Sequence, residues 1–164
     1  MTGVQTCALP IWAIANSLTA KYQIPVTVAT IAQVDAFRAL GMKTLVGITY
    51  FQDDMNDRFA KFLRDDGFAV NAMKGIEVPF KDAGKLAPEA IYNFAKKTFL
   101  DNGPADGIYM LGAGWHNLPV LEMLEKDLKT TVLSSIPAQV WATKKILHLN
   151  EPVLGYGRLL AEMP

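Results

Sequence analysis

The sequence has 164 residues, of which 51% are hydrophobic and 20% are charged, and this composition suits one globular domain with its own core. Lys and Arg together number 16, and so do Asp and Glu, so the net charge is zero and no basic excess predicts binding to nucleic acid or to an anionic membrane surface. No apolar run reaches the length of a membrane span, and the single cysteine excludes a disulfide framework and a thiolate metal site.

The N-terminal segment differs from the rest of the chain. Residues 1–11 have neither a helical nor a strand period, and they read as a translated sequencing-library adapter. We therefore expect an artefactual leader on a gene assembled from environmental reads, with the natural sequence beginning near Trp12 and an upstream part missing. The apolar stretch 8–15 lacks the basic region of a signal peptide, and we expect a cytoplasmic protein.

Strand-like and helix-like segments alternate along the rest of the chain. In order we predict the end of a helix at 13–22, a strand at 25–28, a helix at 31–40, a strand at 44–50, a helix at 53–66, a strand at 68–76, a loop at 79–86, a helix at 88–100, a strand at 107–111, a helix at 118–128, a strand at 131–134 and a helix at 137–147. Thr30 is expected to cap the helix that Gly41 ends, and Gly67 is expected to end the next helix.

The segment 106–119 is the most informative part of this pattern. A short apolar strand ends in Gly112, Ala113 and Gly114, and a helix is expected to begin near Asn117. The alternation predicts an α/β fold with a parallel sheet flanked by helices, and such sheets bind ligands at the carboxyl ends of their strands. Free N–H groups at a helix N-terminus suit a carboxylate or an oxyanion, so we expect the amides of Ala113 and Gly114 to bind a small anionic ligand.

Several segments carry a resemblance to a known family. They are 24–28, 37–42, 49–50 with 53–56, 106–119, 132–141 and 155–159. In order and spacing they resemble the aspartate/glutamate racemase superfamily, in its arylmalonate decarboxylase and maleate cis-trans isomerase branch. The resemblance implies a flavodoxin-like C-terminal lobe at 41–149, a remnant of a second, similar lobe at 12–40, and a tail at 150–164 that returns toward the N-terminal lobe. The site of the family lies between its two lobes.

The resemblance also implies an activity. Family members are cofactor-independent enzymes without a metal that decarboxylate, isomerise or racemise small carboxylates, and we expect an enediolate-type intermediate here. Tyr50 matches a tyrosine whose hydroxyl binds the substrate carboxylate, and Gly112 matches the catalytic cysteine, whose thiol is absent here. His116 is then a candidate proton donor, and Ser134 is a candidate ligand contact. Replacing Gly112 by Cys is expected to give a folded protein that gains turnover, because a thiol near a helix N-terminus has a lowered pKa.

Other interpretations of the same residues stay open. Tyr50 also suits the edge of a core, and His116 a surface position. Ser134 or Ser135 also suits the cap of the following helix. A carboxylate-binding paralogue without turnover is the second functional hypothesis, because the cysteine is missing. A flavodoxin-like nucleotide-binding or receiver domain is the third, and it rests on fold analogy alone. Two-cysteine racemisation is the least favoured reaction, and the substrate and the oligomeric state are left open.

Deleting residues 1–11 should leave the melting temperature within experimental error, because a segment without periodicity offers no apolar face to pack. Thermal unfolding of the full and shortened chains measures the change. A loss of several degrees would mean that the segment packs on the core.

Overall fold

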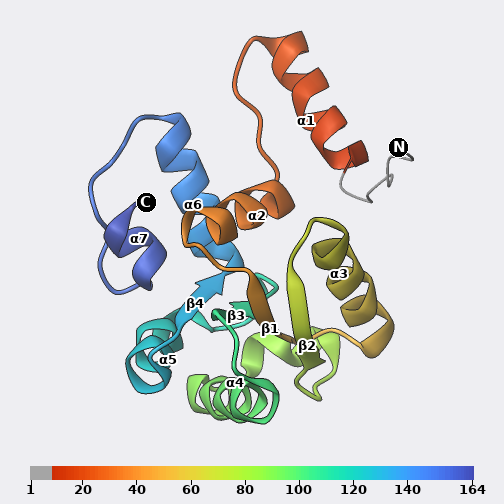
Figure 1. The fold of residues 1–164 in the computed structure, drawn as a ribbon, viewed down its shortest axis with the longest axis vertical. Helices are drawn as coiled ribbons and strands as arrows, with labels where there is room; N and C mark the ends of the chain where they lie inside the picture. The colour runs from red at the N-terminus through yellow and green to blue at the C-terminus, as the bar shows by residue number, and fades with distance from the viewer. Residues whose placement is uncertain (1–8) are drawn as a thin grey trace.

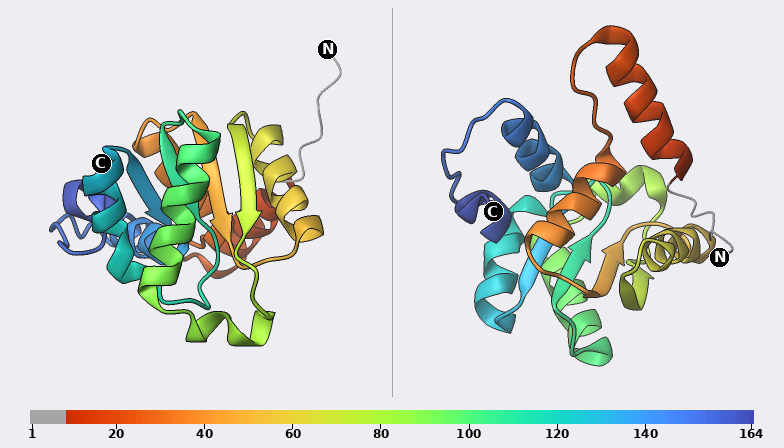
Figure 2. Two further views of the ribbon diagram at one scale, coloured as in Figure 1. Left: turned by 90° about the horizontal axis from the view of Figure 1, so that it is seen from below. Right: turned by 45° about the horizontal axis from the view of Figure 1, so that its top comes forward.

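The computed structural model describes residues 9–164, and a parallel sheet of four strands forms its centre. The strands are β1 (Thr44–Thr49), β2 (Ala69–Gly75), β3 (Gly107–Met110) and β4 (Thr131–Ser134), in the order β2-β1-β3-β4. Every pairing in this sheet is parallel, so the carboxyl ends of the strands share one edge (Figure 2). The predicted α/β class is therefore confirmed.

Helices cover both faces of the sheet (Figure 1). One face carries α2 (Ala29–Ala39), α3 (Asp53–Asp65), α6 (Ser135–Ile146) and α7 (Arg158–Glu162), and the other carries α4 (Pro88–Asn102) and α5 (Leu121–Leu128). Helix α1 (Leu9–Tyr22) stands away from the sheet. Within residues 9–164, no helix has the length and apolar character needed to cross a membrane.

The strands divide the interior into two cores. Successive strand residues point to opposite faces, so Leu45 and Tyr109 pack with α2 and α6, whereas Val46 and Ile108 pack with α4 and α5. These four side chains are at most 2% exposed. Burial on both faces explains why the strands are nearly continuous apolar runs.

Helix α2 belongs to the first of these cores, although residues 12–40 are predicted to be the remnant of a separate lobe. Its residues Val34 and Phe37 are at most 1% exposed. The Phe37 ring makes edge contacts with Tyr109, at 4.9 Å between centroids, and with Phe68, at 5.3 Å. Of the two helices in that range, only α1 stands apart from the sheet.

Glycines end α2 and α3, as predicted. Gly41 and Gly67 have φ values of +70° and +94°, and in each case the N–H groups of the glycine and of the next residue bond carbonyls of the last helical turn. The prediction that Thr30 caps α2 is wrong. The helix already begins at Ala29, and its N-cap is Val28, which has no side-chain hydrogen bond to offer.

Three further predictions differ from the structure. Residues 25–28 form no strand, because Pro25 has no N–H to donate and no strand of the sheet pairs with them. The expected loop 79–86 contains the 3-10 helix η1 (Phe80–Lys85), and the helix expected at 118–128 is divided into the 3-10 helix η2 (Leu118–Val120) and α5. Residues 1–8 of the predicted leader lie outside the described residues, whereas 9–11 belong to α1.

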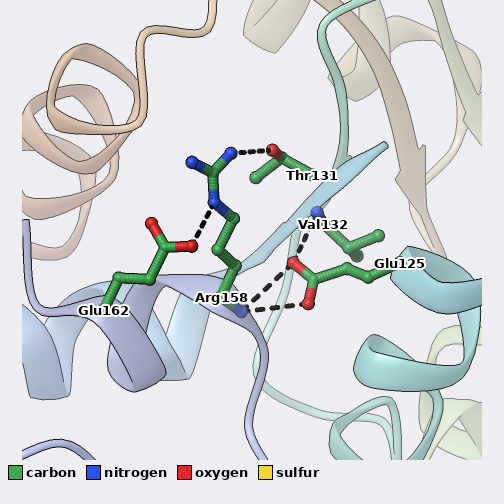
Figure 3. Close-up of polar contacts among 5 residues, drawn as sticks. All are labelled: Glu125, Thr131, Val132, Arg158 and Glu162. Carbon is green, nitrogen blue, oxygen red and sulfur yellow. Dashed lines mark hydrogen bonds and ion pairs between the residues drawn. The ribbon is translucent and has the colours of Figure 1, made fainter. Parts of the chain in front are cut away.

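Glu125 ties the C-terminal tail to β4 (Figure 3). Its carboxylate accepts hydrogen bonds from the N–H of Val132, at 3.0 Å, and from the N–H of Arg158, at 3.0 and 3.2 Å. The Arg158 guanidinium donates in turn to Glu162, at 2.6 Å, and to Thr131, at 3.3 Å. Burial raises the pKa of Glu125, and the N–H donors from Val132 and Arg158 oppose that rise.

Asp106 fastens the beginning of β1 to the segment that precedes β3. One carboxylate oxygen accepts hydrogen bonds from the N–H groups of Lys43 and Thr44, each at 2.8 Å, and from the Thr44 hydroxyl, at 2.9 Å. These donors hold the pKa of Asp106 below its ordinary value of 3.8.

Replacing Asp106 by Asn should lower the free energy of unfolding at neutral pH by about 1 kcal/mol, because charge-assisted bonds are lost at a largely exposed carboxyl. The folded-state pKa is lowered, so this stabilisation is present above pH 3.8 and is lost as the pH falls through the folded-state value. Denaturant unfolding across pH measures the difference, with Asp57→Asn at an exposed helix position as control. A difference between wild type and variant that stays constant across pH would contradict this account.

Candidate functional site

The carboxyl ends of β1 and β3 bring Tyr50 next to the glycine segment 112–114. Tyr50 follows β1 directly, and the N–H of Gly114 donates a hydrogen bond to its hydroxyl oxygen at 3.0 Å. The Tyr50 side chain is 6% exposed, and its ring packs edge-on against Trp115 with centroids 5.4 Å apart. Among residues 9–164 the Tyr50 hydroxyl proton has no acceptor, so it is available for a ligand.

The absence of side chains at positions 112 and 114 is what makes room for Tyr50. Gly112 has φ +106°, and a Cβ placed on it would lie 2.5 Å from Tyr50 Cε1 and 2.9 Å from the hydroxyl oxygen. A Cβ on Gly114 would also lie 2.9 Å from that oxygen. The structure therefore opposes the expectation that a cysteine fits at Gly112, since the backbone conformation and the tyrosine ring both disfavour a side chain there.

The amides of the glycine segment are not equivalent. The N–H of Gly112 donates to Ser135 Oγ at 3.1 Å, and that of Gly114 is taken by Tyr50. The N–H of Ala113 has no partner among the described residues, which makes it the one predicted backbone donor left for a ligand. The following helix is further away than predicted, because α5 begins only at Leu121, so its dipole adds little at this segment.

A cavity of about 220 Å³ adjoins the segment on the side of α2 and α6. Its walls come from the first turns of α2 and α6, from α3 and from the end of β3. Its lining includes Thr30, Gln33, Gly112, Ala113, Ser135 and Gln139. Ala29, Phe59 and Leu111 supply apolar wall, and an apolar cavity with a few convergent polar groups is typical of a small-molecule site.

The two adjacent serines have different surroundings. Ser134 is 0% exposed, and its hydroxyl accepts a hydrogen bond from Asn117 Nδ2 at 3.0 Å. The predicted ligand contact at Ser134 therefore does not face the cavity, and this hydroxyl holds the segment before η2 in place. Its neighbour Ser135 lines the cavity instead.

The other candidate residues lie outside this arrangement. His116 is exposed, does not line the cavity, and makes no hydrogen bond within the described part of the chain, so nothing orients its ring as a proton donor. Asn56, in the first turns of α3, accepts a hydrogen bond from the Thr49 hydroxyl, at 2.6 Å, and donates one to the Phe51 carbonyl, at 3.0 Å. In residues 9–164, no group of three or more His, Cys, Asp or Glu side chains is placed to hold a metal ion.

A larger cavity, of about 720 Å³, lies elsewhere. It borders Asp106 and Thr131, at the amino-terminal ends of β3 and β4, together with Glu125 and Arg158. Ligands of open α/β sheets bind at the opposite edge, where Tyr50 and the glycine segment lie. Size alone therefore does not make this cavity the functional site.

Comparison with known proteins places the chain in a family. A model of the arylmalonate decarboxylase family matches residues 12–160. The chain belongs to this family. It is 26% identical over 141 residues to the arylmalonate decarboxylase of Bordetella bronchiseptica, which covers 85% of this chain and 59% of that protein. It is also 26% identical over 133 residues to the maleate isomerase of Nocardia farcinica (strain IFM 10152), which covers 80% of this chain and 52% of that protein.

The fold of this arylmalonate decarboxylase family member agrees with the match. A solved structure of an arylmalonate decarboxylase mutant in a sulfate-associated form has a TM-score of 0.88 and 24% identity, and the match covers 96% of this chain and 68% of that one. The resemblance expected from the sequence is confirmed. The chain spans between half and three fifths of the length of the curated relatives it matches.

The sequence interpretation missed the contribution of α2 and α6 to the site. Thr30, Gln33 and Gln139 line the cavity, and none of them lies at the end of a strand. A signal was present at Gln33, which precedes Phe37 by one helical turn. That spacing puts a polar amide on the face that α2 buries.

Replacing Gly112 by Ala should lower the free energy of unfolding by about 1–3 kcal/mol more than Gly67→Ala does. Both glycines have positive φ, but a Cβ on Gly67 would have nothing within 4 Å, so the excess isolates the clash with Tyr50. Chemical denaturation measures both losses. In a Tyr50→Ala background the excess should shrink, and equal losses for the two glycines would show that the ring does not oppose a side chain.

Proposed function

We propose that this chain carries the carboxylate-binding site of a cofactor-independent decarboxylase or isomerase that acts on a small carboxylate. Membership of the arylmalonate decarboxylase family supports the class of reaction. One observation supports the site: the Tyr50 hydroxyl, whose proton has no acceptor among residues 9–164, accepts from the Gly114 N–H at the carboxyl edge of β1 and β3, and the preceding amide, that of Ala113, has no partner there.

The two donors suit an enediolate-type intermediate. When an α-carbon loses CO₂ or a proton, the electron pair left behind spreads onto the oxygens of the remaining carboxylate. Donors directed at those oxygens then bind the intermediate more strongly than the starting acid, which lowers the barrier. Tyr50 is held in place by the Gly114 amide and by its ring contact with Trp115, so little reorganisation is needed.

A carboxylate-binding paralogue without turnover is the second candidate. The Tyr50 ring occupies the space that a side chain at position 112 would need, and this favours the paralogue. A proton-donating side chain could be placed there only if Tyr50 moved. His116 lacks an orienting partner among residues 9–164. Such a binder would use the same Tyr50 and Ala113 donors and would omit the proton transfer.

Binding of phenylmalonate and maleate to the ¹⁵N-labelled chain tests the carboxylate site at Tyr50 and Ala113, which both candidate functions require. We expect the Ala113 amide resonance to shift, and Tyr50→Phe to weaken binding about tenfold because a hydrogen bond to a charged group is lost. Tyr22→Phe, at an exposed tyrosine of α1, is the matched control and should bind as wild type does. Equal affinities of wild type and Tyr50→Phe would refute the assignment of Tyr50.

Product formation in the same samples separates the two candidates. Phenylacetate from phenylmalonate, or fumarate from maleate, is followed by proton NMR. Turnover that Tyr50→Phe abolishes supports the enzyme. Binding without product supports the paralogue only when the chain has been extended with its expected upstream part, because that part would supply the other half of an inter-lobe site.

A further inference from the structure

Trp115 holds the carbonyl group at the beginning of the glycine segment. Its indole Nε1 donates a hydrogen bond to the Gly112 carbonyl oxygen at 3.0 Å. The Trp115 side chain is buried in the core on the side of α4 and α5, where its ring also contacts Tyr50. An indole N–H can only donate, and packing fixes the ring that carries it. The position of this donor is therefore set by the core and not by the glycine segment itself.

The hydrogen bond to the Gly112 carbonyl also sets the direction of the Ala113 N–H. The two groups belong to one peptide unit, which is planar and trans. In a trans unit the C=O and N–H bonds point in opposite directions. Because the carbonyl oxygen points to the Trp115 indole, the Ala113 N–H points away from that indole.

The neighbouring peptide units of the segment are held in a different way. The N–H groups of Gly112 and Gly114 each donate to a side-chain hydroxyl, at 3.1 and 3.0 Å. The unit between them, which joins Gly112 to Ala113, has Trp115 as its only hydrogen-bond partner among residues 9–164. The orientation of the unpartnered Ala113 N–H thus depends on a hydrogen bond at the other end of its own peptide unit.

The glycine at position 112 makes this restraint necessary. A peptide plane rotates when ψ of the residue before it and φ of the residue after it change in opposite directions. Gly112 has φ +106° and no Cβ, so it resists such a rotation little. A rotated unit would turn its carbonyl oxygen toward the place of the N–H, and a carbonyl can only accept a hydrogen bond. The restraint on this plane therefore decides whether the segment offers a carboxylate a donor or a repelling oxygen.

We propose that Trp115 is a positioning residue of the site, which directs the Ala113 N–H toward the substrate carboxylate through its hydrogen bond to the Gly112 carbonyl. The inference rests on the proposed function, because this N–H matters to the reaction only if it binds the carboxylate. A donor that is oriented before the reaction begins contributes most where negative charge develops, as in an enediolate-type intermediate. Trp115 acts through Ala113, since its own N–H is already used by Gly112.

The direction of the Ala113 N–H can be measured in the free chain by its residual dipolar coupling, with the sheet amides as the reference. Trp115→Phe keeps an aromatic ring beside Tyr50 but has no N–H to donate. We expect the coupling to agree with a fixed N–H that points away from the indole in the wild type, and to change in the variant because the peptide plane is released. An unchanged coupling in the folded variant would overturn the proposal.

Trp141 offers a matched control. It is 7% exposed, and its Nε1 is fully enclosed without a hydrogen-bond partner within the described residues. Trp141→Phe therefore removes a buried indole but no hydrogen bond, and the Ala113 coupling should stay at its wild-type value. If both variants change this coupling equally, general loosening explains the result and the proposal is wrong.

A measurement on the wild type covers the case in which Trp115→Phe does not fold. A scalar coupling across the hydrogen bond, between Trp115 Nε1 and the Gly112 carbonyl carbon, is expected in the folded chain. Its presence supports the restraint, and its absence removes the basis of the proposal.

Binding of phenylmalonate, followed by calorimetry, separates this inference from the proposed function. Trp115→Phe should weaken binding about fivefold and reduce the shift of the Ala113 amide resonance, whereas Trp141→Phe should change the affinity less than about twofold. If the wild type binds but Trp115→Phe alters neither the coupling nor the affinity, the role of Trp115 is wrong and the function stands. If the coupling changes and the affinity does not, Trp115 orients the amide but the amide does not bind the carboxylate, so the proposed function fails.

Discussion

The candidate site depends on the close approach of the Tyr50 ring to the backbone at Gly112 and Gly114. Neither position can carry a side chain while the ring is there, so the hydroxyl, the Gly114 amide and the turn after β3 form one rigid arrangement. The turn after β3 lies within the part of the chain, residues 12–160, that the family model matches, and its shape is set by the tyrosine ring. Position 112 therefore offers only its backbone to this edge of the sheet, because a side chain there would meet the Tyr50 ring.

The glycine segment also joins the two cores of the molecule. Tyr50 belongs to the cluster on the side of α4 and α5, whereas Tyr109 belongs to the cluster on the side of α2 and α6. Gly112 contacts the first through the Tyr50 ring and the second through Ser135. A ligand at Ala113 would therefore be held by groups whose positions are set by both layers of the fold, and such groups lose little order when the ligand binds.

The sequence predicted the sheet well because its signals are local. Each strand is a short apolar run, and Gly41 and Gly67 end helices where only a positive φ closes the last turn. Tyr50 and the glycine segment could be predicted to lie together because strand ends in a parallel sheet share one edge, and the structure does bring them into contact. Gln33 was missed because its buried position depends on a hydrogen bond from Tyr109, which lies 76 residues away and which no local pattern encodes. The strand predicted at 25–28 is absent for a similar reason: a strand forms only where a neighbouring strand pairs with it, and a local pattern does not show whether such a partner exists.

The tail contact at Glu125 has a consequence for how the fold responds to acid. Burial raises the pKa of Glu125 above its ordinary value of 4.5, so protonation favours the folded state, and this contribution is present at low pH and lost as the pH rises through the folded-state value. Asp106 borders the 720 Å³ cavity that Glu125 also borders. Its pKa is lowered, so its contribution to the free energy of unfolding is present at higher pH and is lost only below pH 3.8. On acidification the gain at Glu125 therefore comes before the loss at Asp106, so these two contributions to the free energy of unfolding have opposite signs.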